Sequence, residues 1–108
     1  MATTKIAPAR LTRTLAAVAA EIRQDYVSKG KPVYYAAVPY VDALLVMNTT
    51  DLGASYYQDS AATLVRYLLA NLSTWRGETA QRVKAELKAA LAFHDKQQRG
   101  NMHPAYWD

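Results

Sequence analysis

The chain has 108 residues, of which 51% are hydrophobic, and a formal net charge of +4. This length predicts one domain built around a single hydrophobic core. The absence of cysteine excludes disulfide bonds and thiolate chemistry, and it suits a reducing compartment.

The sequence shows no pattern for secretion or membrane insertion. Residues 1–10 lack the positively charged start and apolar run of a secretory signal. The most apolar window, residues 33–47, is interrupted by Pro39 and Asp42 and is too short to span a bilayer. We therefore expect a cytoplasmic protein that has no contact with membranes.

The first predicted helix covers residues 8–29 and follows a polar, flexible arm at residues 1–7. Pro8 suits the first helical turn, where its missing N–H would have no partner. Gly30 then supplies the left-handed residue that ends many helices. The apolar stripe of this helix has spacings of three and four residues and consists of Leu11, Leu15, Val18, Ile22 and Tyr26.

An irregular, tyrosine-rich segment follows the first helix. Residues 33–38 contain β-branched and aromatic side chains that suit an extended chain, and a two-stranded pairing around Tyr34 and Tyr56 is a weaker alternative. Pro39 favours the start of a second, short helix. Residues 48–55 are rich in Asn, Thr, Asp and Gly, which predicts a loop.

A third helix is predicted over residues 60–72, where a wide apolar stripe indicates the most buried helix. Asp59 is its expected N-cap, because a carboxylate accepts hydrogen bonds from the free N–H groups of a first turn. A fourth helix extends to about residue 97, and a tail occupies residues 101–108. Together these elements predict an all-α fold. It is a compact bundle of about four helices in one domain, residues 8–100, with the tyrosine-rich segment between the first and second.

The junction before the fourth helix contains the sequence TWRGET. Ser73 or Thr74 is expected to cap this helix, which would begin within the next three residues. Trp75 and Arg76 are unusual residues for a plain joint. A buried Trp75 would indicate a joint, whereas an exposed Trp75 beside Arg76 would indicate a binding site.

Catalytic and metal-binding patterns are sparse in this sequence. The histidines, His94 and His103, have no ligand-type partner at helical spacing, so we predict no metal site and no cofactor. The chain has neither a nucleophile elbow nor a glycine-rich phosphate loop. Three carboxylates, Asp42, Asp51 and Asp59, are the only candidate hydrolytic group. Positions on an outer helix face, in a turn and at a cap explain them more simply, so we expect no enzymatic activity.

Tyrosine is the most unusual feature of the composition, with eight residues against one Phe and two Trp. Its ring buries apolar area while its hydroxyl still requires water or a partner, which suits half-exposed positions. These rings either cover the helical core or form a partner-binding face, because Tyr, Trp and Arg dominate interface hot spots. In a homodimer, such a face would meet its own copy. The predicted partner-binding residues are Tyr34, Tyr35, Tyr40, Tyr56, Tyr57, Trp75 and Arg76.

The positive charge of the fourth helix suggests a second function, nucleic-acid binding. Lys84 and Lys88 share a helix face despite their mutual repulsion, which is compatible with an anionic partner. Glu78 and Arg82 have the spacing of an ion pair along the same helix. Residues 67–87 can be aligned with a helix-turn-helix, although its compact glycine-centred turn is missing. The candidate nucleic-acid-binding residues are Arg76, Gln81, Arg82, Lys84 and Lys88.

Three stretches are similar to one group of proteins: KPVYYAAVPYVDAL, DSAATLVRYLLAN and TWRGETAQRVKAEL. They resemble small accessory proteins encoded by phages of mycobacteria and related actinobacteria, and the similarity covers residues 31–91. No activity, cofactor or site residue is established for that group, so no functional residue is carried over. The resemblance implies a phage product in the bacterial cytoplasm, where small phage proteins commonly bind and redirect a host protein. We therefore expect a non-enzymatic interaction module that acts on a host or phage protein.

Overall fold

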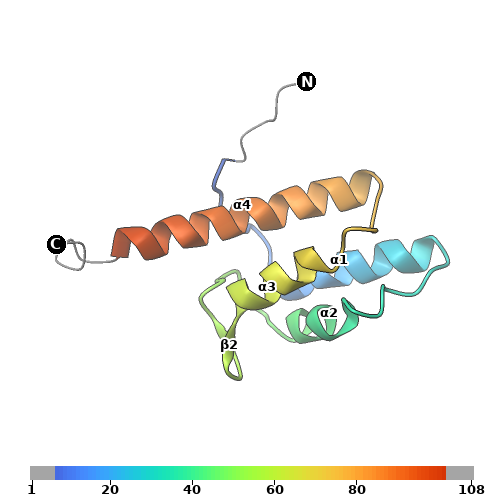
Figure 1. Ribbon diagram of the computed structural model, residues 1–108, viewed down its shortest axis with the longest axis horizontal. Coiled ribbons are helices and arrows are strands. Elements are labelled where there is room, and N and C mark those ends of the chain that lie inside the picture. Colours follow the sequence, from blue (N-terminus) through green and yellow to red (C-terminus); the bar gives the residue numbers. More distant parts are fainter. Residues whose placement is uncertain (1–6, 102–108) are drawn as a thin grey trace.

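The computed structural model describes residues 7–101 and shows a mainly helical protein (Figure 1). The predicted arm at residues 1–7 and the predicted tail at residues 101–108 lie almost entirely outside the described residues. In chain order the elements are α1 (Leu15–Ser28), α2 (Val38–Leu45), β1 (Ser55–Tyr56), β2 (Asp59–Ser60), α3 (Ala61–Ala70) and α4 (Glu78–Asn101).

The helices of the described range enclose one hydrophobic core. α1 packs against α2 and α4, and α3 packs against the same two helices (Figure 1). No helix within residues 7–101 combines the length and the apolar character needed to cross a bilayer. The largest fully buried side chains are Leu15, Ile22, Leu44, Leu68, Leu72, Leu87, Val18, Val41, Val65 and Val83.

A short β-hairpin between α2 and α3 corrects the all-α prediction. β1 and β2 pair antiparallel, with Ser55 opposite Ser60 and Tyr56 opposite Asp59. The alternative pairing of Tyr56 with Tyr34 is therefore wrong. The irregular segment between α1 and α2 is confirmed, but the extended chain considered for residues 33–38 is wrong, because residues 35–37 form a turn and Val38 begins α2.

α1 begins at Leu15, so the predicted helix start at Pro8 is wrong. The Thr14 hydroxyl caps the helix by accepting a first-turn N–H at 3.1 Å. The first two N–H groups of α1 donate to the carbonyls of Thr49 and Met47 at 2.8 and 3.0 Å, outside the helix. Leu11 keeps its place in the apolar stripe because it is buried without being helical.

A glycine marks the end of α1, a proline lies in the first turn of α2, and a serine caps α3. Pro39 lies in the first turn of α2, as predicted, and Gly30 adopts a left-handed φ of 69° after α1. Ser60 caps α3, because its hydroxyl accepts the Thr63 N–H at 3.2 Å. The predicted cap, Asp59, lies in β2 instead.

α4 begins at Glu78, later than the predicted start. The predicted caps, Ser73 and Thr74, lie in the turn that precedes it. Gly77 stands directly before the helix with a φ of 113°, which side chains other than glycine rarely tolerate. The glycine, rather than a hydroxyl cap, therefore lets the chain turn into α4.

An ion-pair network joins α4 to α1 and to the segment before α1. Arg13 donates to Glu86 at 3.0 and 2.7 Å and lies 2.6 Å from a carboxylate oxygen of Glu21. Arg82 also pairs with Glu21, so the predicted pair between Arg82 and Glu78 is wrong. Hydrogen bonds from Arg82 and then Arg13 outweigh desolvation and hold the pKa of Glu21 below its ordinary value.

The joint between α3 and α4 (residues 71–77) is fixed against the end of α1. Trp75 is only 3% exposed, stacks on Tyr26 with ring centroids 6.0 Å apart, and donates its indole N–H to Asp25 at 2.8 Å. Lys29 pairs with the same carboxylate at 2.8 Å and donates to a backbone carbonyl of the joint at 2.8 Å. Trp75 therefore belongs to a structural joint.

Removing the charge of Asp25 tests this anchor. The hydrogen bond from Lys29, followed by that from Trp75, outweighs desolvation and holds the pKa of Asp25 below its ordinary value of 3.8. We expect Asp25→Asn to lower the free energy of unfolding by about 1–3 kcal/mol at about pH 7. Because the folded pKa is lowered, this difference is present above pH 3.8 and is lost as the pH falls through the folded value.

Urea unfolding of the wild type and the variant at neutral pH and at about pH 3 measures the difference. Asp42→Asn, which changes an exposed carboxylate on α2, is the control and should alter stability little. Equal losses in the two variants, or a loss in Asp25→Asn that does not depend on pH, would contradict the anchor.

Candidate functional site

The predicted tyrosine face is divided among three parts of the fold. Tyr34 and Tyr35 pair with each other between α1 and α2, with ring centroids 4.9 Å apart. Tyr40 of α2 pairs with Tyr67 of α3 at 5.7 Å, and the two hairpin tyrosines pair at 4.7 Å. Figure 1 shows the α1–α2 connection and the hairpin at opposite ends of α2. The structure therefore does not bring the five predicted tyrosines into one face.

These tyrosines also differ in exposure. Tyr35 and Tyr57 are 78% and 87% exposed, and Tyr34 is 40% exposed. Tyr40 and Tyr56 are half-buried and pack against the core, which matches the alternative in which the rings cover it. Tyr34 and Tyr35 are thus the two predicted tyrosines that are exposed together in one segment.

The α1–α2 connection (residues 29–37) borders an apolar pocket of about 290 Å³. Val27 of α1 and Val38 of α2 are exposed, and both line this pocket. Together with Tyr34 and Tyr35 they form the Val–Tyr patch (Val27, Tyr34, Tyr35 and Val38). Single exposed apolar residues are ordinary, but a group of them beside a pocket is typical of a binding surface. The pocket is lined by Arg23, Tyr26, Val27, Lys31, Pro32, Val33, Val38, Val41 and Asp42.

The wall of the apolar pocket contains a buried hydroxyl. Tyr26 is 7% exposed, and its hydroxyl oxygen has no hydrogen-bond partner in the part of the chain that the structure describes. Burial raises the pKa of Tyr26, and a contact with the backbone of Tyr34, which falls outside hydrogen-bond geometry, offsets part of this rise. A buried hydroxyl without a full hydrogen bond lowers stability.

Trp75 does not fit the partner-binding role predicted for it. Its burial and its hydrogen bond to Asp25 hold it in the joint, where a partner protein has no access to it. Arg76 is exposed, and its backbone carbonyl accepts a hydrogen bond from Lys29 at 2.8 Å. The structure therefore separates the two neighbours, with Trp75 in the core and Arg76 at the surface.

The predicted nucleic-acid-binding residues are partly engaged within the fold. Arg82 pairs with α1, and Lys84 donates to a backbone carbonyl of the joint at 2.7 Å. Burial, followed by the charges of Lys88 and Arg76, lowers the pKa of Lys84. Gln81 is exposed on the same helix. We call Arg76, Lys84 and Lys88 the basic cluster, because their charges act on one another.

The connection between α3 and α4 differs from that of a helix-turn-helix. It spans residues 71–77, whereas the motif uses a turn of about three or four residues. α4 is also long, continuing to Asn101, and its last turns extend past the other helices (Figure 1). The basic cluster therefore lies on a helix whose connection and length differ from those of a recognition helix.

The three candidate carboxylates lie in different places. Asp42 borders the apolar pocket, Asp51 borders a second pocket, and Asp59 lies in β2. Asp51 accepts the Gly53 N–H at 2.8 Å, which confirms its predicted turn role. Within residues 7–101, no group of three or more His, Cys, Asp or Glu side chains is placed to hold a metal ion.

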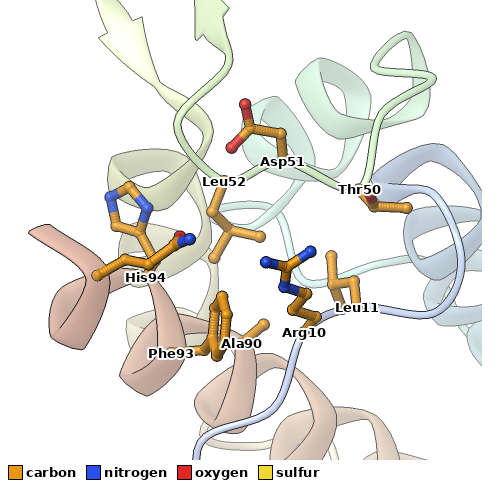
Figure 2. Close-up of a pocket in the computed structure, with 9 residues that line it drawn as sticks. Arg10, Leu11, Thr50, Asp51, Leu52, Ala90, Phe93 and His94 are labelled. Carbon is orange, nitrogen blue, oxygen red and sulfur yellow. The ribbon is translucent and has the colours of Figure 1, made fainter.

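The second pocket, which we call the Arg10 pocket, has a volume of about 310 Å³. Figure 2 shows that its walls come from the segment before α1, from the segment between α2 and β1, and from α4. The Arg10 guanidinium carbon lies 5.0 Å from the centroid of the Phe93 ring. The pocket is lined by Arg10, Leu11, Thr50, Asp51, Leu52, Ala90, Phe93, His94 and Gln97.

Sequence reasoning did not find the Arg10 pocket. Its residues come from three separated segments, and no spacing rule connects residue 10 with residues 50–52 or with α4. His94, for which the sequence predicts no metal-binding role, is half-buried at the edge of this pocket. The other histidine, His103, lies outside the described residues. The pocket exists only because the segments pack together.

Comparison of the chain with protein-family models, curated proteins and solved structures finds no match. The resemblance to phage accessory proteins therefore stays a prediction from the sequence.

Removing the buried hydroxyl tests the environment of the apolar pocket. We expect Tyr26→Phe to leave the free energy of unfolding unchanged or to raise it by up to about 1 kcal/mol, because no hydrogen bond is lost. Urea unfolding measures the change, with Tyr67→Phe as a control for an exposed hydroxyl. A loss of stability greater than about 1 kcal/mol would show that the Tyr26 hydroxyl is hydrogen-bonded in the folded protein.

Proposed function

We propose that this protein is a non-enzymatic interaction module that binds another protein through the Val–Tyr patch. The observation that carries the proposal is an apolar pocket lined by the exposed Val27 and Val38, with the exposed Tyr34 and Tyr35 in the connection between these two residues. Buried aromatic and aliphatic anchors supply most of the binding energy at protein interfaces. The other exposed large apolar side chains in the described range, Val46, Tyr57 and Tyr67, lie on other parts of the fold.

The charges around the apolar pocket favour a partner segment of particular chemistry. Arg23 and Lys31 line the pocket, and within residues 7–101 neither takes part in an ion pair. Asp42 is the one carboxylate among the lining residues. A partner segment that places an apolar side chain in the pocket and acidic residues beside it would meet both the apolar surface and the excess positive charge.

The proposal includes a biological setting that rests on the sequence resemblance. A phage product of this kind would act in the bacterial cytoplasm on a host or phage protein. A second copy of the chain is the alternative occupant of the Val–Tyr patch, in a symmetric homodimer. The net charge of +4 opposes self-association to a modest degree, which favours a different, acidic partner.

The basic cluster supports a second candidate function, nucleic-acid binding. The positive charges of Lys88 and Arg76 lower the pKa of Lys84, so the fold holds like charges close together. Phosphate groups relieve such repulsion. The engagement of Arg82 with α1 and the length of the α3–α4 connection make this candidate the weaker one.

Affinity capture from a mycobacterial lysate tests the Val–Tyr patch with two matched double variants. Val27→Ala/Tyr35→Ala removes side chains that are 61% and 78% exposed from the patch. Val46→Ala/Tyr57→Ala removes the same residue types, 68% and 87% exposed, from outside it. We expect the patch variant to recover a specific partner about tenfold less well than the wild type, because it loses two anchor side chains, and the control to recover it fully.

Equal recovery by the two variants would contradict the proposed surface. Sedimentation of the purified protein over a range of concentrations distinguishes the homodimer. Self-association that is lost in Val27→Ala/Tyr35→Ala would assign the patch to a second copy. Capture in the presence and absence of nuclease shows whether recovery depends on nucleic acid.

A salt titration tests the nucleic-acid candidate. Arg76→Ala/Lys88→Ala removes two exposed charges of the basic cluster and leaves Lys84, which holds the joint, in place. If the cluster contacts phosphates, the slope of log affinity against log salt concentration should become shallower by roughly two. Lys96→Ala/Arg99→Ala, at the exposed end of α4, is the control with the same charge change. Absent binding at low salt, or equal slopes for the two variants, would exclude the cluster.

A further inference from the structure

The Arg10 pocket combines charged side chains with a small apolar base. Leu11, Leu52 and Ala90 are buried at this base, whereas Arg10 and Asp51 are exposed. The accessible surface of the pocket is mostly polar, so the polar groups are the main determinants of how a ligand is oriented. In the view of Figure 2, the charged ends of Arg10 and Asp51 lie on different sides of the Leu52 side chain.

Two opposite charges border this pocket without neutralising each other. Among the described residues, neither Arg10 nor Asp51 takes part in an ion pair. The Arg10 guanidinium lies over the Phe93 ring instead, so its N–H donors stay available. One oxygen of Asp51, Oδ1, accepts the Gly53 N–H at 2.8 Å, and the other remains available as an acceptor. The pocket therefore presents donors on one side and an acceptor on the other.

Gly53 brings the acceptor side close to α4. A Cβ atom on this residue would lie 3.2 Å from Asp51 Oδ1 and 3.7 Å from His94 Cε1. The side chains of Asp51 and His94 both lie near the position that a side chain at residue 53 would occupy, and such a side chain would press against the carboxylate.

We infer that the Arg10 pocket binds a small zwitterion with an apolar body, of the class of free amino acids with an aliphatic side chain. The ligand carboxylate accepts hydrogen bonds from Arg10, and its ammonium group donates to the available oxygen of Asp51. The aliphatic side chain packs on Leu52 and Ala90. An anion alone would approach the like charge of Asp51, and a cation alone that of Arg10, so the pair of charges selects a ligand that carries both.

Leucine is the probe, and three compounds that each lack one of its groups are the controls. Isocaproate lacks the ammonium group, isoamylamine lacks the carboxylate, and glycine lacks the aliphatic side chain. Amide NMR titration of the full chain should show leucine shifting the signals of pocket residues, with a dissociation constant on the order of 1 mM. Each control compound should bind about tenfold more weakly, because it leaves either one charged residue without a partner or the apolar base without a packed side chain.

Two variants connect each ligand group with its residue. Arg10→Gln should weaken leucine and isocaproate about tenfold without weakening isoamylamine, which no longer approaches a like charge. Asp51→Asn should weaken leucine and isoamylamine about tenfold without weakening isocaproate, for the same reason. Arg99→Gln, on the exposed end of α4, is the control and should bind leucine like the wild type. Dispersed amide spectra verify that the variants are folded. If a variant does not fold, the comparison of leucine with the three control compounds on the wild type still tests the inference.

Three results would overturn the inference. The first is an absence of shifts at pocket amides with leucine at about ten times the expected dissociation constant. The second is equal binding of isocaproate and leucine, which would remove the role of Asp51. The third is wild-type affinity for leucine in both Arg10→Gln and Asp51→Asn. Neither the Val–Tyr patch nor its partner enters this test, so the inference stands or falls separately from the proposed function.

Discussion

The hydrogen bond between the Trp75 indole and Asp25 fixes how the late part of the chain meets the early part. Because this contact holds the joint against the last turns of α1, it sets the direction in which α4 starts along the core. α4 in turn carries Glu86, which pairs with Arg13, and Phe93, which lies under Arg10. The same end of α1 supplies a wall of the apolar pocket. Both candidate surfaces are thus built partly from helices that this part-buried contact connects.

Periodicity in the sequence was sufficient to predict that the four helices exist, because each buries a stripe with helical spacing. It failed at helix starts, where tertiary contacts compete with the helical ones. The N–H of Leu15 donates to a carbonyl of a distant loop, so the turn before it has no need to be helical. Asp59 and Ser60 are adjacent and equally suitable as caps. Both lie in β2, and α3 begins directly after Ser60, which therefore takes the cap position. A hairpin with two residues in each strand is too short to give a periodic signal.

The candidate sites were less predictable than the fold, for two physical reasons. Residue type alone does not show whether a side chain is buried or exposed. Trp75 was as suitable for an interface as for the core, and its hydrogen bond to Asp25 shows why an indole occupies this joint. The second reason is that contacts between segments far apart in the sequence have no local pattern. Glu78 lies at favourable helical spacing from Arg82, yet Arg82 pairs with Glu21 on another helix. The Arg10 pocket arises in the same way.

The hydrogen bonds at the start of α1 give the Arg10 pocket a dynamic property. The amides of Leu15 and Ala16 donate to the carbonyls of Thr49 and Met47, immediately before the loop residues that form one wall of the pocket. Fraying of the first turn of α1 would break these two hydrogen bonds and remove their restraint on the loop. A molecule bound in the pocket would therefore slow hydrogen exchange at Leu15 and Ala16, although it touches neither residue. The first turn of α1 thus helps to hold in place the loop wall of the Arg10 pocket, which lies far from it in the sequence.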